Sequence, residues 1–143
     1  MSDIVEKAKT WIGTPFKHQG RDKYIGADCA GLIIGVGEET GSMKLDDIEK
    51  KILKRYRRFP APSEVLNLLK RFFNQVEDGG QKIGDVALIK SRDSRSGHLG
   101  IITQLEPFLI IIHANDNLGK IVEQGIPLRS ASRVAGYFRY RGL

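Results

Sequence analysis

Residues 26–36 read Gly-Ala-Asp-Cys-Ala-Gly-Leu-Ile-Ile-Gly-Val, and most of what the sequence predicts follows from this stretch. Asp28 is a residue type favoured at helix N-caps, and apolar residues follow it at helical spacing, so we expect a helix that runs from there to Gly41. Cys29 then lies in the first helical turn, beside unpaired backbone N–H groups and the positive end of the helix dipole. Both features favour the thiolate form of the side chain. A buried, unreactive cysteine is the more common alternative for a free thiol.

Helical patterns also flank this stretch, separated from it by polar, glycine-rich sequence. We expect a first helix between Ser2 as cap and Gly13 as stop, with Ile4, Ala8, Trp11 and Ile12 on one face, and then an ordered loop over Thr14 to Gly26. A charged helix is expected over 44–56. A further helix is expected over Ser63–Val76, ended by Gly79-Gly80, with Val65, Leu69, Phe72 and Val76 facing inward.

The pattern changes at Gly80, after which short apolar runs alternate with turn residues. The runs cover 86–89, 99–103, 108–113, 120–124 and 134–140. Such spacing predicts an antiparallel sheet of about five strands. Helices followed by strands indicate an α+β fold, and a chain of 143 residues has room for one domain, spanning 1–143.

Two of the three histidines lie in the strand region. His98 immediately precedes the run 99–103, and His113 closes the run 108–113. If these runs pair as adjacent antiparallel strands, both rings lie at the same edge of the sheet. A nucleophilic cysteine needs a base and a group that orients the base, and Cys29, His98 and His113 are candidates for these three roles. For either histidine alone, a structural role is the alternative.

The third histidine, His18, lies in the loop that leads to the cysteine helix and is a candidate to line its cleft, or else a surface residue. Asp28 is either only a helix cap or also a carboxylate that meets a substrate amine. A zinc site from the cysteine and the three histidines ranks lower, because no pair has a typical ligand spacing. We therefore expect no metal and no cofactor.

Composition limits the class of protein. Hydrophobic residues make up 41% and charged residues 28%, which excludes extensive disorder, a collagen-like repeat and a membrane span. Residues 1–9 contain no long apolar run, so we expect no secretory signal and no membrane insertion. The protein is then made in the cytoplasm, and any route out of the cell is non-secretory.

The net charge of +6 favours an anionic partner. Six cations lie within Lys50 to Arg58, a run most often found on a solvated helix face. Tyr56 and Phe59 are weak support for stacking on a nucleic acid, so we expect no nucleic acid as a partner. We interpret the run as a docking surface for an anionic or protein partner.

Five blocks of the sequence together resemble the NlpC-type cell-wall peptidases, in that family's order. They are Trp11-Ile12-Gly13-Thr14-Pro15-Phe16, Asp28-Cys29-Ala30-Gly31-Leu32, Gly84-Asp85-Val86-Ala87-Leu88, Gly97-His98-Leu99-Gly100-Ile101 and Ile112-His113-Ala114. The resemblance implies a minimal papain-like fold and a cysteine endopeptidase that cuts peptidoglycan stem peptides, commonly next to D-glutamate and a diamino acid. It further implies that Cys29 is the nucleophile, His98 the base and His113 the orienting residue, with Asp28 at the substrate cleft.

The segment Phe16-Lys17-His18-Gln19 is similar to the branch found in phage tails and gene transfer agents, which implies a peptidase carried in a particle with particle proteins as partners. The sequence departs from the family at Ala30, where most relatives have serine, and at His18, where many have an aromatic residue. Three alternatives stay open. They are another papain-like reaction such as an amidase or acyltransferase, a non-catalytic tail component, and a nucleic-acid-binding module.

Overall fold

The computed structural model describes residues 3–54, 56, 60–127 and 133–143. The predicted Ser2 cap and, within the basic run, Arg55, Arg57 and Arg58 lie outside these residues, as does Phe59. The helices are α1 (Asp3–Lys9), α2 (Cys29–Glu39), α3 (Asp47–Ile52) and α4 (Pro62–Phe72), and the strands are β1 (Arg21–Asp22), β2 (Gly26–Ala27), β3 (Phe73–Val76), β4 (Val86–Lys90), β5 (Gly97–Gln104), β6 (Ile110–Asn115), β7 (Lys120–Gly125) and β8 (Val134–Tyr140).

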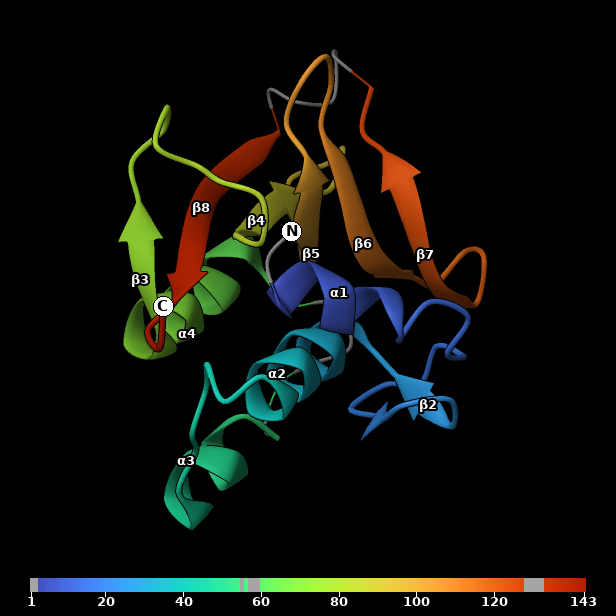
Figure 1. Ribbon diagram of the computed structural model, residues 1–143, viewed down its shortest axis with the longest axis vertical. Helices are drawn as coiled ribbons and strands as arrows, with labels where there is room; N and C mark the ends of the chain where they lie inside the picture. Colours follow the sequence, from blue (N-terminus) through green and yellow to red (C-terminus); the bar gives the residue numbers. More distant parts are fainter. Residues whose placement is uncertain (1–2, 55, 57–59, 128–132) are drawn as a thin grey trace.

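An antiparallel sheet of six strands, in the order β3-β8-β4-β5-β6-β7, forms one side of the described part of the chain. The helices lie together along one side of this sheet, with α2 beneath β5 and β6 and α4 beneath β3 (Figure 1). The α+β prediction is confirmed, although the sheet has one strand more than the five expected. None of the helices in the described residues has the length and apolarity that crossing a bilayer requires.

The additional strand comes from the predicted helix over 63–76. That helix ends at Phe72, and residues 73–76 form β3, which pairs with β8 in the register Phe73 to Tyr140 and Val76 to Tyr137. The helical prediction is therefore wrong for 73–76. The reason is tertiary, because strand pairing and the contact of the Phe73 ring with Tyr140 outweigh the local helical pattern.

The other helices are shorter than predicted. α1 ends at Lys9, and residues 10–13 turn so that the Gly13 N–H donates to the Ile121 carbonyl at the start of β7. Ile12, predicted on the buried face, is consequently 41% exposed. α3 begins only at Asp47, where Asp46 and Glu49 form a capping box. The loop over 14–26 is ordered as expected, and its end pairs as the short strands β1 and β2, of which β2 extends to Ala27.

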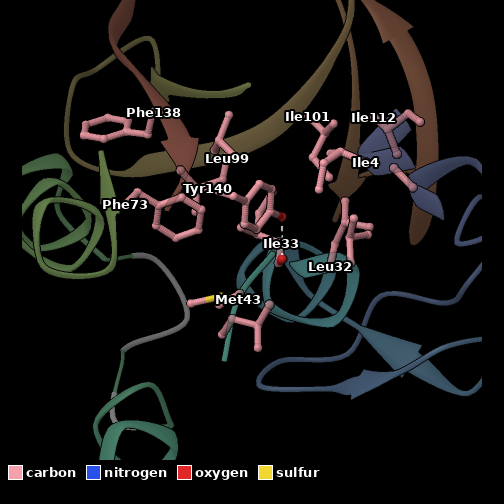
Figure 2. Packing of buried hydrophobic residues seen from close by; sticks show 14 of the residues in the cluster. Ile4, Leu32, Ile33, Met43, Phe73, Leu99, Ile101, Ile112, Phe138 and Tyr140 are labelled. Carbon is pink, nitrogen blue, oxygen red and sulfur yellow. Dashed lines mark hydrogen bonds between the residues drawn. The ribbon is translucent and has the colours of Figure 1, made fainter. Parts of the chain in front are cut away.

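The core joins α2 to the sheet (Figure 2). Leu32 and Ile33 of α2 are buried against apolar side chains of β5, β6 and α1, and Met43 adds to the cluster below β8. Tyr140 of β8 is buried within this cluster, and its hydroxyl donates to the Ile33 carbonyl at 2.5 Å. This packing fixes the start of α2 relative to the central strands.

Candidate active site

The start of α2 presents Cys29 to the sheet. Asp28 is the N-cap in extended backbone conformation, and its Oδ1 accepts from the Gly31 N–H at 2.8 Å, as the sequence predicts. Gly31 lies so close to the Gly20 carbonyl that a Cβ at this position would clash with it. The loop before α2 and the first turn of α2 are therefore packed backbone to backbone, which holds the cysteine in place.

The two strand histidines meet, as the predicted hairpin requires. β5 and β6 pair in the register Ile101 to Ile112, which places His98 and His113 on neighbouring strands near the same end. His98 Nε2 and His113 Nδ1 are 2.5 Å apart, and the rings are nearly perpendicular with centroids 4.8 Å apart. The prediction that both rings share one sheet edge is confirmed.

Gln124, which the sequence did not reveal as a site residue, extends the histidine pair. His113 Nε2 lies 2.8 Å from Oε1 of Gln124 on β7, and Asn115 Nδ2 donates to the same oxygen at 3.2 Å. The only feature of the sequence that indicated Gln124 was its position in the predicted strand that follows the strand of His113. The result is a row of side chains across β5, β6 and β7.

The Cys29 sulfur borders the same cleft as both rings. Its electrostatics differ from the prediction, because burial raises the pKa of the thiol to about 12 and the charge of Asp28 adds to the rise. Hydrogen bonding to the backbone at Leu99, Ala30 and Cys29 itself acts in the opposite direction but does not outweigh burial. The expected thiolate is therefore not the resting form, and among the described residues the sulfur has no hydrogen bond to either imidazole.

The histidines are neutral at rest. Burial lowers the pKa of His98 to about 3, with the neighbouring His113 as the second cause. Burial also lowers the pKa of His113, and the hydrogen bond to Gln124 partly offsets this. A neutral imidazole has a free lone pair and serves as a proton acceptor. The site therefore holds a thiol and a neutral base rather than a preformed ion pair.

The cleft has a volume of about 440 Å³ and is lined by both polar and apolar residues. Its polar lining residues are Asp28, Cys29, Tyr56, Ser91, Ser96, His98, His113, Asn115, Asp116 and Asn117. Its apolar lining residues include Ile33 of α2, Met43, and Val65, Leu69 and Phe72 of α4. Cys29, His98 and His113 thus all line one cleft whose remaining walls are partly polar and partly apolar, which is the usual composition of a ligand site.

Asp28 is 4% exposed and its second oxygen is also occupied. Oδ2 accepts from the Gln19 N–H at 2.7 Å and from the Tyr56 hydroxyl at 2.5 Å. Burial and the charge of Asp28 raise the pKa of Tyr56, so the hydroxyl keeps its proton. Tyr56 was not predicted as a site residue.

The structure places His18 beside Asp28 but not in the wall of the cleft. Its Nδ1 is 4.0 Å from Asp28 Oδ2, and its ring contacts Tyr56 edge to face at a centroid distance of 5.7 Å. Within the described ranges, no group of three or more His, Cys, Asp or Glu side chains is arranged to hold a metal ion.

Comparison with known proteins gives the fold a name. No family model matches the sequence, and no curated protein matches it. Solved structures do match. An NlpC/P60 family protein from Bacillus cereus superposes with a TM-score of 0.66 at 17% identity, over 96% of this chain and 39% of that one. The NlpC/p60 domain of the peptidoglycan hydrolase SagA gives 0.60 at 18% identity, over 96% and 98%.

A third similar structure is RipD from Mycobacterium tuberculosis, described as a non-catalytic NlpC/p60 domain protein adapted to peptidoglycan binding. Its TM-score is 0.52 at 14% identity, over 95% of this chain and 92% of that one. The chain thus has an α+β fold in which a helix-borne cysteine and two strand-borne histidines border one cleft. It is the fold of the NlpC/P60 domains, which confirms the resemblance at the level of the fold.

Proposed function

We propose that this protein is a cysteine hydrolase that cleaves amide bonds in peptidoglycan stem peptides. The observation that carries the proposal is the common cleft bordered by Cys29, His98 and His113, with the two rings hydrogen bonded to each other. A nucleophile, a base and a group that orients the base are the parts that acyl transfer requires. The shared fold with the SagA domain supports peptidoglycan as the substrate.

In the proposed reaction, the sulfur of Cys29 attacks the amide carbonyl while His98 takes the thiol proton. The protonated imidazole then donates this proton to the leaving amine as the C–N bond breaks, which leaves a thioester on Cys29. Water, deprotonated by His98, hydrolyses the thioester and regenerates the thiol. Because thiol and imidazole are both neutral at rest, proton transfer accompanies the attack rather than preceding it.

Backbone N–H groups at the start of α2 are the donors available to the developing oxyanion. The loss of one such donor in a hydrolase typically reduces the rate by roughly 10²–10³. The close contact between Gly31 and the Gly20 carbonyl fixes the backbone on which these groups lie. Precise placement of the first turn is therefore part of the proposed mechanism.

Asp28 and His18 remain the proposed substrate residues. Asp28 lines the cleft, and its Oδ2 is the oxygen that faces Tyr56. A substrate amine reaches this carboxylate by displacing the Tyr56 hydroxyl, and His18 then lies within the same group of side chains. This arrangement suits a stem peptide with a free amino group.

We further propose that the cleaved bond lies next to D-glutamate and a diamino acid, and that the protein acts on the wall as part of a phage-like particle. The similarity of residues 16–19 to the phage-tail branch supports the second point, and the net charge of +6 suits an anionic wall.

A non-catalytic, peptidoglycan-binding role is the second candidate. It is favoured by the non-catalytic RipD domain with the same fold and by the raised pKa of the Cys29 thiol, which has no hydrogen bond to an imidazole in the described residues.

Digestion of purified peptidoglycan separates the two candidates. Wild-type protein, Cys29→Ala and the surface control Thr10→Ala are incubated with it, and released fragments are identified by mass spectrometry. The proposal predicts fragments with new peptide amino and carboxyl ends from the wild type and the control, and none from Cys29→Ala. Binding without fragments from folded wild-type protein would refute the hydrolase and support the second candidate.

A further inference from the structure

Gln124 takes part in the site although nothing in the sequence assigned it a role. β6 and β7 pair in the register Ile111 to Gln124 and His113 to Val122, so Gln124 lies diagonally opposite His113 on the same face of the sheet. Its Oε1 lies 2.8 Å from His113 Nε2. An amide oxygen only accepts hydrogen bonds, so the shared proton belongs to His113 Nε2.

Asn115, which lies outside the histidine pair, fixes the orientation of the Gln124 amide. The backbone N–H of Leu118 donates to Asn115 Oδ1 at 3.0 Å. A backbone N–H has no acceptor role, so Asn115 must present its NH₂ group on the other side. That group donates to Gln124 Oε1 at 3.2 Å. The oxygen of Gln124, and not its nitrogen, therefore faces His113.

The tautomer of His113 in turn determines that of His98. A neutral imidazole with its proton on Nε2 has a bare Nδ1, so His113 Nδ1 accepts a hydrogen bond. Its partner at 2.5 Å is His98 Nε2, which therefore carries the proton of the His98 ring. The remaining nitrogen, His98 Nδ1, is left bare and available as a base.

We propose that Gln124, oriented by Asn115, is a positioning residue that acts through His113 to hold His98 in the tautomer whose Nδ1 accepts the proton from Cys29. The proposal rests on the proposed function for the identity of the proton donor. The tautomers themselves follow from the hydrogen bonds alone. A chain of donors that begins at one backbone amide of the turn after β6 thus sets which atom of His98 is the base.

NMR of protein labelled with ¹⁵N-histidine tests the tautomers directly, because the two ring nitrogens have different shifts when protonated and when bare. The wild type should show both His98 and His113 protonated at Nε2 and bare at Nδ1. Gln124→Leu removes the acceptor, so the Nδ1-protonated form should appear in both rings. Gln124→Glu keeps an acceptor oxygen and should restore the wild-type pattern.

Kinetics on a soluble muropeptide provide the second readout. Gln124→Leu should lower kcat about tenfold with KM unchanged, as expected for the loss of one orienting hydrogen bond, and Gln124→Glu should recover most of it. Glu123→Leu, the same kind of change on the neighbouring exposed residue of β7, is the matched control and should change neither readout.

Two results would overturn the proposal. One is a wild-type spectrum with Nδ1 protonated in either ring, and the other is an unchanged spectrum in Gln124→Leu. A protein that fails to cleave peptidoglycan but shows the expected tautomers, and their change in Gln124→Leu, would refute the proposed function and leave the positioning role of Gln124 intact. The NMR arm needs no turnover, so the two failures are distinguishable.

Discussion

Burial of His98 predicts a defined loss of stability in acid. The pKa of this histidine falls from 6.5 to about 3 in the folded protein, so the unfolded chain binds one more proton than the folded chain between these values. The stability of the folded protein that depends on a neutral His98 is therefore fully present above about pH 6.5, and it is lost as the pH falls towards 3. Replacing His98 with glutamine removes the titrating group while keeping a polar side chain of similar size.

The size of the effect follows from the shift. While His98 stays neutral in the folded protein, each pH unit below its unfolded pKa lowers the unfolding free energy by about 1.36 kcal/mol. Two units, at about pH 4.5, therefore lower it by about 3 kcal/mol. Between about pH 7 and about pH 4.5, wild-type protein should therefore lose about 3 kcal/mol more unfolding free energy than His98→Gln. Carboxylates titrate in both proteins, and their contribution cancels in the difference.

Urea denaturation at the two pH values measures this difference. Thr10→Ala is the control, because it changes an exposed residue that does not titrate and should lose as much stability as the wild type. Equal losses in wild type and His98→Gln would show that burial does not hold His98 neutral. A direct check on the wild type is the His98 NMR signal, which should not titrate between these pH values.

Three further predictions concern the packing that positions the site, and each is measured by urea unfolding. Gly31→Ala should lower the unfolding free energy by about 2 kcal/mol, because the clash with the Gly20 carbonyl outweighs the gain in helix propensity. A stabilised variant would contradict the close contact. Asp85→Asn should cost about 3 kcal/mol, since it removes the charge and one of the two carboxylate oxygens that accept 2.8 Å hydrogen bonds from Arg139 at a side chain that is 2% exposed. A cost no larger than that of an ordinary surface substitution would exclude a stabilising Asp85–Arg139 ion pair. Tyr140→Phe should cost about 1 kcal/mol for the lost hydrogen bond to α2, and no change at all would mean that the hydroxyl contributes nothing to the packing of β8 on α2.

The sequence predicted the parts of the fold that depend on local pattern. The cap at Asp28, the start of α2 and the five strands after Gly80 follow from residue type and spacing alone. β3 could not be predicted in this way, because residues 73–76 continue a helical pattern and become a strand only by pairing with β8. Partners 60 or more residues away in the chain have no local signature.

The candidate site was predictable to a similar degree. The hairpin rule was sufficient to bring His98 and His113 together. The thiolate expectation for Cys29 was wrong for the resting protein, because helix-end effects were visible in the sequence and burial was not. Gln124 and Tyr56 were missed for the same reason, since their importance comes from side-chain contacts between separate elements.

An acyl group carried by Cys29 is the central intermediate of the proposed reaction, and hydroxylamine added during turnover tests for it most directly. Hydroxylamine competes with water for a thioester, so part of the carboxyl-side product from a soluble muropeptide should appear as a hydroxamate, in an amount that rises with hydroxylamine concentration. Cys29→Ala should form neither product. Cleavage that yields only the free carboxylate at every hydroxylamine concentration, and that proceeds equally fast in Cys29→Ala, would contradict the account.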